Sequence, residues 1–183
     1  MTPGGIPHHV DLRTLAVKEV LLQGGVEARH LPRLTALVRA VVGSVGVNAQ
    51  FFRDEENRYA VKLETTATVR LVCQRCLEDL ETSVGSETLI AAVWDDEQAA
   101  QLPARYEPVI AGSEVDFWEV VEDELLLSMP TFPYHSEPDC ELKAGGETVP
   151  ATGEGTAEEL TGEGSKPFAA LAALKGQLNQ PEP

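Results

Sequence analysis

The sequence predicts an α+β fold, with a small antiparallel sheet or barrel flanked by a few helices, an acidic linker and a short C-terminal helix. Three observations favour this class. Apolar and polar residues alternate through the middle of the chain, polar turns separate the alternating stretches, and helical spacing of apolar residues occurs on both sides. The 183 residues, 43% of them apolar, can form one domain with a substantial core.

The N-terminal part is expected to supply a strand and a helix. Residues 10–22 are typical of a short turn or helix followed by a strand, which Gly24 and Gly25 would end. Beyond them, apolar residues recur at helical spacing over 31–42, and Pro32 suits the first turn of a helix.

The middle of the chain is rich in predicted strands. Alternation marks strands at 45–52, 59–73 and 81–94, with a polar turn at 54–57 between the first two. Strands joined by short polar turns favour an antiparallel meander or a small barrel.

A break at 101–103 precedes another short strand, at 106–111, and a well-marked helix. Asp116 is the predicted N-cap of this helix, and Glu119 three residues later is its capping-box partner. The helix is expected to stop before Pro130, because proline ends a helical pattern.

Composition divides the chain into three parts. Residues 1–143 are expected to form a single α+β domain, 144–164 an acidic flexible linker, and 165–183 a C-terminal amphipathic helix and tail. The linker contains five Glu and no Lys or Arg, so disorder is the expectation there. Phe168 and Leu171 lie on the apolar stripe of the terminal helix. A helix this short is marginal alone and should dock on this protein or on a partner.

Charge is unevenly distributed along this acidic protein, whose net charge is −16. Residues 1–80 carry ten Lys/Arg and nine Asp/Glu, whereas residues 81–183 carry four and twenty-one. Such an acidic half repels a phosphate backbone and attracts basic proteins, although solubility alone would also account for it. Glu119, Glu122 and Asp123 are candidate contacts for a basic partner, with a solvated helix face as the alternative.

The sequence excludes several classes of protein. No apolar run is long enough for a transmembrane helix, and the N-terminus lacks the features of a secretory signal. Three cysteines are an odd number that argues against a disulfide framework, so we expect a cytoplasmic protein without membrane contact. Phosphate-binding, serine-hydrolase and zinc-protease motifs are missing, and we expect neither catalysis nor a small-molecule substrate.

All the cysteines lie in two segments that share ligand-type chemistry. Cys73 and Cys76 form a CxxC pair, and His135 and Cys140 follow about sixty residues later. Together the four side chains could hold a zinc ion. Packed thiols without an ion are the alternative, and a redox couple is a third reading that the preceding β pattern disfavours.

Five arginines offer a different reading, in which the chain contacts RNA directly. Aromatic residues for base stacking are sparse around them, and phosphate contact by such a patch would be weak and salt-dependent. The candidate RNA-binding residues are Arg29, Arg33, Arg39, Arg70 and Arg75.

Four segments together resemble the bacterial YceD family, called the large ribosomal RNA subunit accumulation protein. They are LVCQRCLE at 71–78, YEP at 106–108, VEDELLLSMP at 121–130 and KPFAALAALK at 166–175, and the segment at 133–140 fits as well. The resemblance implies a role in synthesis, processing or stability of 23S ribosomal RNA. It also implies that the partner is a ribosomal protein or a large-subunit assembly intermediate, or 23S rRNA itself. We therefore expect a non-enzymatic adaptor or escort, with a direct RNA-binding module as the alternative.

Overall fold

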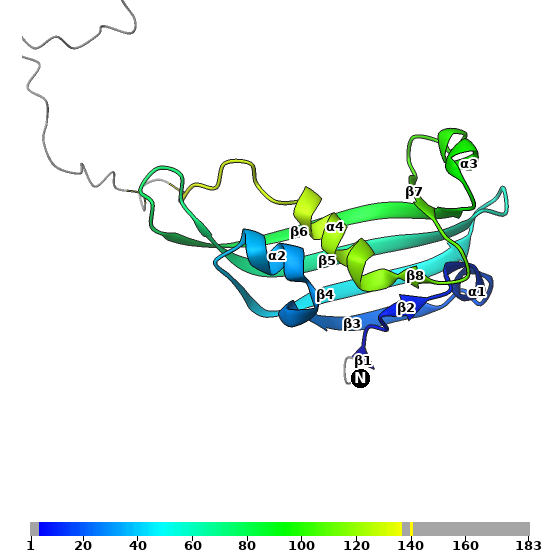
Figure 1. The fold of residues 1–183 in the computed structure, drawn as a ribbon, viewed down its shortest axis with the longest axis horizontal. Coiled ribbons are helices and arrows are strands. Elements are labelled where there is room, and N and C mark those ends of the chain that lie inside the picture. Colours follow the sequence, from blue (N-terminus) through cyan, green and yellow to red (C-terminus); the bar gives the residue numbers. More distant parts are fainter. Residues whose placement is uncertain (1–3, 137–139, 141–183) are drawn as a thin grey trace, which may run out of the picture. The chain divides into compact units, whose positions relative to one another are not determined.

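The computed structural model describes residues 4–136 and Cys140. A six-stranded sheet has the strand order β1-β3-β4-β5-β6-β7, and a two-stranded ribbon of β2 and β8 accompanies it. Helices α2 and α4 lie over one face of the sheet (Figure 1). The predicted α+β class is confirmed, and of the two forms expected the structure has the open sheet, because the described strands do not close into a barrel.

The elements follow one another in a simple order along the chain. The strands of the large sheet are β1 (Gly4–Gly5), β3 (Leu21–Glu27), β4 (Ala40–Arg53), β5 (Tyr59–Val72), β6 (Asp79–Val93) and β7 (Glu107–Ile110). The ribbon consists of β2 (His9–Val10) and β8 (Val115–Asp116). The helices are α1 (Leu12–Val17), the 3-10 turn η1 (Ala28–His30), α2 (Pro32–Leu37), α3 (Asp96–Ala100) and α4 (Phe117–Leu127).

The four central strands form the antiparallel meander that the sequence predicts. β3 pairs with β4, β4 with β5, and β5 with β6. The β5–β6 ladder runs from Ala60↔Ala91 to Val72↔Asp79 with no register shift. Alternate residues therefore point to opposite faces, which gives one apolar face and one polar face.

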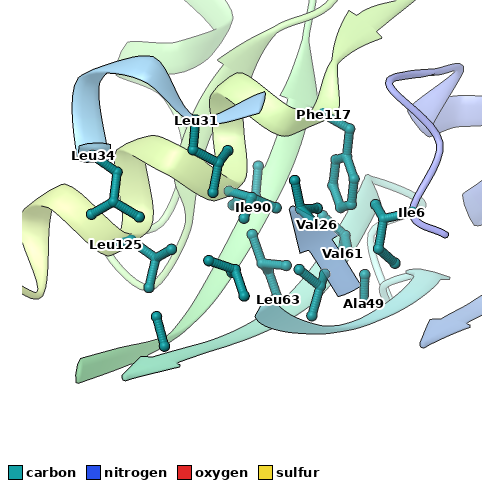
Figure 2. Close-up of a cluster of buried hydrophobic side chains, with 14 of the residues drawn as sticks. Ile6, Val26, Leu31, Leu34, Ala49, Val61, Leu63, Ile90, Phe117 and Leu125 are labelled. Carbon is teal, nitrogen blue, oxygen red and sulfur yellow. The ribbon is translucent and has the colours of Figure 1, made fainter. Parts of the chain in front are cut away.

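The apolar face of the sheet packs against α2 and α4 (Figure 2). Leu63 and Ile90 from the strands are buried with Leu34 from α2 and Leu125 from α4. Phe117 begins α4 and is fully buried, with its ring tilted against that of Phe51 at 5.8 Å between centroids. This shared core fixes α4 across the sheet, and α4 in turn determines where the chain goes after residue 127.

Helix α4 begins as predicted. The Asp116 side chain accepts a hydrogen bond from the backbone N–H of Glu119 at 3.0 Å, so Asp116 is the N-cap. The helix ends at Leu127, before Pro130.

The helix expected over 31–42 is much shorter in the structure. Helix α2 ends at Leu37, and β4 begins at Ala40. Apolar residues at 38, 41 and 42 mimic helical spacing, but all three are valines, and β-branched residues favour a strand. The prediction was wrong because the pairing of β4 with β5 decided the conformation of this segment.

The sequence predicts that the glycine pair at 24–25 ends the first long strand, and this prediction was wrong. β3 continues through it to Glu27, and Gly25 pairs with Gly46 of β4. Strand β4 approaches closely there, since a Cβ atom on Gly25 would lie 3.1 Å from Ser44 Oγ. Glycine here permits close packing rather than a turn.

Two further expectations concern the ends of the chain and membranes. The predicted linker at 144–164 and terminal helix at 165–183, with Phe168 and Leu171, lie outside the described residues. Among the described helices, none has the length and apolar character that a membrane crossing requires.

The β4–β5 turn is held by one carboxylate. Asp54 Oδ1 accepts hydrogen bonds from the backbone N–H groups of Glu56 and Arg58, at 2.9 and 2.8 Å. Its Oδ2 accepts from the Arg58 guanidinium at 2.8 Å and from the Tyr106 hydroxyl at 3.1 Å. Asp54 therefore ties the turn to the segment that leads into β7.

We expect Asp54→Ala to lower the free energy of unfolding by about 2–3 kcal/mol at neutral pH, because it leaves several donors without their acceptor. Burial raises the pKa of Asp54, but the hydrogen bonds from Arg58, Tyr106 and Glu56 outweigh it and hold the pKa below its usual value. The stabilisation is therefore complete above the unfolded pKa and is lost as pH falls through the folded pKa. Urea unfolding should show the difference between wild type and variant shrinking on acidification, whereas the exposed Glu55→Ala control should show little difference at any pH.

Candidate metal centre

The CxxC pair lies at the turn between β5 and β6. The Cys73 N–H donates to the Glu78 carbonyl at 2.8 Å, and the Leu77 N–H donates to the Cys73 carbonyl at 3.0 Å. These two bonds close the chain into a compact loop, with Cys73 fully buried and Cys76 partly buried. The long β5–β6 ladder therefore places both thiols at one end of the sheet.

The second ligand segment reaches this turn after α4. The Gln74 N–H donates to the Pro133 carbonyl at 2.9 Å, which fixes the returning chain against the CxxC loop. His135 follows two residues later, and Cys140 lies in the same cluster. The two segments that the sequence pairs by chemistry are thus adjacent in space.

The four candidate ligands converge. Their ligand atoms all lie within 4.8 Å of one another. The distance from Cys73 Sγ to Cys140 Sγ is 3.6 Å, and that from Cys76 Sγ to His135 Nδ1 is 3.3 Å. A tetrahedral zinc ion with ordinary bond lengths separates two sulfurs by about 3.8 Å and a sulfur and a nitrogen by about 3.6 Å. The observed separations are close to those values, so the donor set fits such an ion.

The imidazole of His135 is oriented as in many metal sites. Its Nε2 lies 3.0 Å from the backbone carbonyl oxygen of Asp79. A carbonyl only accepts hydrogen bonds, so Nε2 carries a proton, and Nδ1 is the ring nitrogen that faces Cys76. A backbone bond of this kind fixes the tautomer and orientation of a ligating histidine.

The thiols have different proton affinities. Burial raises the pKa of Cys73, but hydrogen bonds from the backbone N–H groups of Cys76, His135 and Arg75 outweigh it and lower the pKa to about 5. Burial and the neighbouring Cys73 and Cys76 raise the pKa of Cys140 to about 11. All three cysteines are free, and a site with one thiolate already favoured is suited to a cation.

Large apolar side chains are exposed around this end of the sheet. A groove beside the cluster is lined by residues that include Leu37, Val72, Gln74, Met129 and Pro133. Exposed apolar residues lie in the segments that form the groove and the CxxC loop. They are Leu37, Leu77, Leu127, Phe132 and Tyr134, with exposed fractions of 58, 75, 82, 65 and 49%.

Leu77 combines two unfavourable features. Its φ angle is 62°, in the left-handed region that leucine rarely adopts, and its side chain projects into solvent. Strain of this kind is concentrated at functional sites. Leu77 is not among the site residues predicted from the sequence, although a large apolar residue directly after a CxxC pair is the signal that could have found it.

The predicted acidic contacts on α4 occupy different environments. Glu119 and Asp123 are exposed, but Glu122 is only 3% exposed. The Glu122 carboxylate accepts from Arg33 Nε at 2.8 Å and from the Leu34 N–H at 2.9 Å. The expectation of a solvated carboxylate therefore does not hold for Glu122, which joins α4 to α2.

Arg29 and Arg33, two of the five arginines proposed to contact RNA, are paired with carboxylates. Arg33 is paired with Glu122 and with Asp123, at 2.8 and 2.7 Å. Arg29 pairs with Glu27 at 3.0 Å. These two arginines are neutralised by acidic neighbours, which weakens their case as phosphate contacts.

The other three arginines lie in or beside the strands that lead to the cluster. The Arg39 N–H donates to the Arg70 carbonyl at 2.8 Å, and the exposed Arg39 side chain has no partner among the described residues. The Arg70 guanidinium pairs with Glu81 at 3.3 Å. The Arg75 guanidinium lies 5.5 Å from the centre of the Tyr134 ring.

A second group of ligand-type side chains was not predicted from the sequence. Ligand atoms of His8, His9 and Asp116 lie within 4.8 Å of one another, because β2 pairs with β8. Asp116 caps α4 and also accepts from His8 Nε2 at 3.0 Å. The helix N-terminus disfavours a cation there, so capping and the stacking of His8 on Trp118 account for the arrangement.

Comparison with known proteins identifies relatives over most of the chain. Residues 61–175 match the family described as large ribosomal RNA subunit accumulation protein YceD. A protein of that name from Haemophilus influenzae is 32% identical over 172 residues, which cover 93% of this chain and 96% of the relative. No solved structure gives a significant match.

We expect Glu122→Gln to destabilise the fold and Asp123→Asn to leave it nearly unchanged. Glu122 is buried and serves both Arg33 and the Leu34 N–H, so losing its charge should lower the free energy of unfolding by about 2–3 kcal/mol. Asp123 is exposed, and a surface ion pair is worth about 0–1 kcal/mol. Chemical denaturation of both variants would measure the contrast, and equal losses would contradict the assigned roles.

Proposed function

The chain belongs to the YceD family, and we propose that it supports accumulation of 23S rRNA as a non-enzymatic adaptor for a basic protein. That partner is a large-subunit ribosomal protein or an assembly intermediate that contains one. The name of the Haemophilus relative supports the ribosomal RNA part of the proposal. The adaptor part has separate support in the surface around the Cys/His cluster.

The observation that carries the adaptor proposal is the exposure of Leu77, Phe132 and Tyr134 beside this cluster. Large apolar side chains that gather on a surface mark interaction sites more often than chance exposure does. Leu77 is held at positive φ, where a glycine would cost less, so its side chain has a use outside the fold. A protein surface is the partner that an exposed aliphatic side chain such as that of Leu77 fits best.

Charge favours a basic partner over RNA. A chain with a net charge of −16 repels a phosphate backbone and attracts a basic protein. The exposed Glu119 and Asp123 remain candidate contacts for that partner, whereas Glu122 stabilises the fold.

The environment of the thiols supports a non-enzymatic role. Cys73 has the lowered pKa, but its side chain is fully buried and bonded within the cluster. A nucleophilic or redox cysteine must reach its substrate. Cys73 is instead placed to bind an ion or to pack.

Zinc held by Cys73, Cys76, His135 and Cys140 is part of this proposal. Such an ion would join the turn between β5 and β6 to the segment that follows α4. Phe132 and Tyr134 lie in that segment, so the ion would hold the apolar contacts in place. Zinc in this position stabilises a binding surface and performs no chemistry of its own.

Direct binding of 23S rRNA is the second candidate function, and one observation favours it. Arg75 lies over the exposed ring of Tyr134, and an arginine–aromatic pair can stack on an unpaired base. Arg39 is exposed and could contact a phosphate. Against it, Glu78, Asp79 and Glu81 surround the same end of the sheet.

We expect the protein purified under reducing conditions to contain about one zinc ion per chain, measured by elemental analysis. His135→Gln should weaken zinc binding by at least about 10-fold, because it removes one of four ligands. His30→Gln is the matched control, since His30 lies outside the cluster. Zinc-free protein after purification with added zinc, or equal zinc content in both variants, would contradict the metal site.

We expect the double variant Leu77→Gly, Phe132→Ala to lose support of 23S rRNA accumulation. The test expresses each variant in a bacterial strain without its own family member and measures the ratio of 23S to 16S rRNA. Stability should change by about 1 kcal/mol or less, because glycine relieves the positive φ at position 77. Leu21→Ala is the control, since Leu21 is also a large exposed apolar residue, at 55%, but lies on β3.

The same strain distinguishes the two candidate functions. The RNA-binding function would replace the adaptor if two results occurred together. The double variant would keep normal 23S rRNA levels, and Arg39→Glu would lose both 23S rRNA accumulation and binding to protein-free 23S RNA. Recovery of a ribosomal protein on the tagged chain after ribonuclease treatment is the result expected for an adaptor.

A further inference from the structure

Strand β6 has a long free edge. On one side it pairs with β5 from Asp79 to Ala91, but on the other side β7 pairs only with Ile90 to Val93. At the opposite end, His135 bonds the carbonyl of Asp79. Within the described part of the chain, residues 80–89 therefore have no strand on their outer side. At a rise of about 3.3 Å per residue, this edge is about 33 Å long.

The edge is regular and lacks most of the devices that block strand addition. Proteins protect free edges with proline, bulges or charged residues that point inward. Residues 80–89 contain no proline, and the ladder with β5 has no register shift there. The inward-facing side chains, which alternate from Leu80 to Thr88, are uncharged. An edge of this kind is competent to pair with another strand.

The remaining protection is acidic charge on the outer face. Glu81 and Glu87 are exposed there, with small residues at 83 and 85 between them. Arg70 of β5 pairs with Glu81 at 3.3 Å, and Lys62 of β5 pairs with Glu87 at 2.8 Å. These pairs reduce the negative electrostatic potential of the edge without removing it. The edge strand itself carries no basic residue from 79 to 93.

This charge selects among the possible occupants. A second copy of the chain would bring its own Glu81 and Glu87 to the same edge, and like charges facing each other oppose pairing. The acidic segment at 144–164, with five Glu and no Lys or Arg, is disfavoured for the same reason. A basic, extended segment of another protein meets complementary charge along the whole edge.

We infer that the free edge of β6, residues 80–89, binds an extended basic peptide segment of a partner protein as an added β-strand. Backbone hydrogen bonds give such an interaction its affinity, and alternate side chains give its specificity. Basic side chains of the guest lie beside Glu81 and Glu87, and the intervening ones contact the Val84 side of the strand. The inference rests on the proposed function in that the partner is taken to be a basic protein.

The test uses the full chain and synthetic ten-residue peptides of alternating Lys and Val. Two isomers carry N-methyl groups, one on every Lys nitrogen and the other on every Val nitrogen. Only one of these sets faces the host strand, because successive N–H groups of a strand point to opposite sides. We expect one isomer to bind like the parent peptide and the other about 10-fold or more weaker. Attraction by charge alone would leave the two isomers equal, and that result would overturn the inference.

Two charge-matched variants locate the site. The double variant Glu81→Lys, Glu87→Lys should bind the parent peptide about 10-fold or more weakly than the unchanged chain does. The double variant Glu55→Lys, Glu114→Lys makes the same change in net charge at exposed positions away from the edge. It should weaken binding of the parent peptide by less than about 2-fold. Hydrogen exchange should show peptide-dependent protection of alternate amides within 80–89. Equal effects of the two variants, or protection elsewhere only, would contradict the assignment.

These outcomes are separate from a failure of the proposed function. Peptide binding is measured on the purified chain and needs no ribosomal component. Normal 23S rRNA levels in cells without the chain would refute the proposed function and leave the N-methyl result unaffected. Equal binding of the two isomers would refute the strand site and leave the accumulation result unaffected.

Discussion

The unbroken pairing of β5 with β6 is the constraint on which both candidate surfaces depend. It carries the CxxC turn to one end of the sheet, beyond Val72 and Asp79. Because β7 joins β6 only near its other end, the same pairing leaves the outer side of 80–89 uncovered. The CxxC turn of the Cys/His cluster and the free edge are thus consecutive parts of one hairpin, and a partner that contacts Leu77 can continue along β6.

The cluster also holds the segment after α4 against the β5–β6 hairpin. Residues 130–136 contain two prolines and no regular structure, and none of their side chains is fully buried. Contacts to the hairpin are therefore needed to hold this segment. The Gln74–Pro133 backbone bond and the convergence of His135 with the three thiols supply them. An ion bound by four ligands from both segments would make this junction far less dependent on the bond at Pro133.

Chemistry-bearing residues were easier to predict from the sequence than their environments. The CxxC pair with His135 and Cys140 was found because ligand-type side chains are rare and their spacing is distinctive. The Asp116 cap was found because capping depends on local residues. The length of α2 and the path of β3 through Gly25 were missed, since tertiary pairing decided both. The burial of Glu122 was missed because a carboxylate on a helix shows its exposure only after the neighbouring helix is placed.

The distribution of acidic residues shows why composition alone gave an incomplete account of the surface. Glu122 and Glu124 add to the formal charge, yet both are buried, and Glu124 accepts from the Ser86 hydroxyl at 3.0 Å. They join α4 to α2 and to β6, so they stabilise the layer that defines the edge. Glu81 and Glu87 carry the same charge on the exposed face of that strand. Buried carboxylates therefore position the strand, and exposed ones determine which partner its edge accepts.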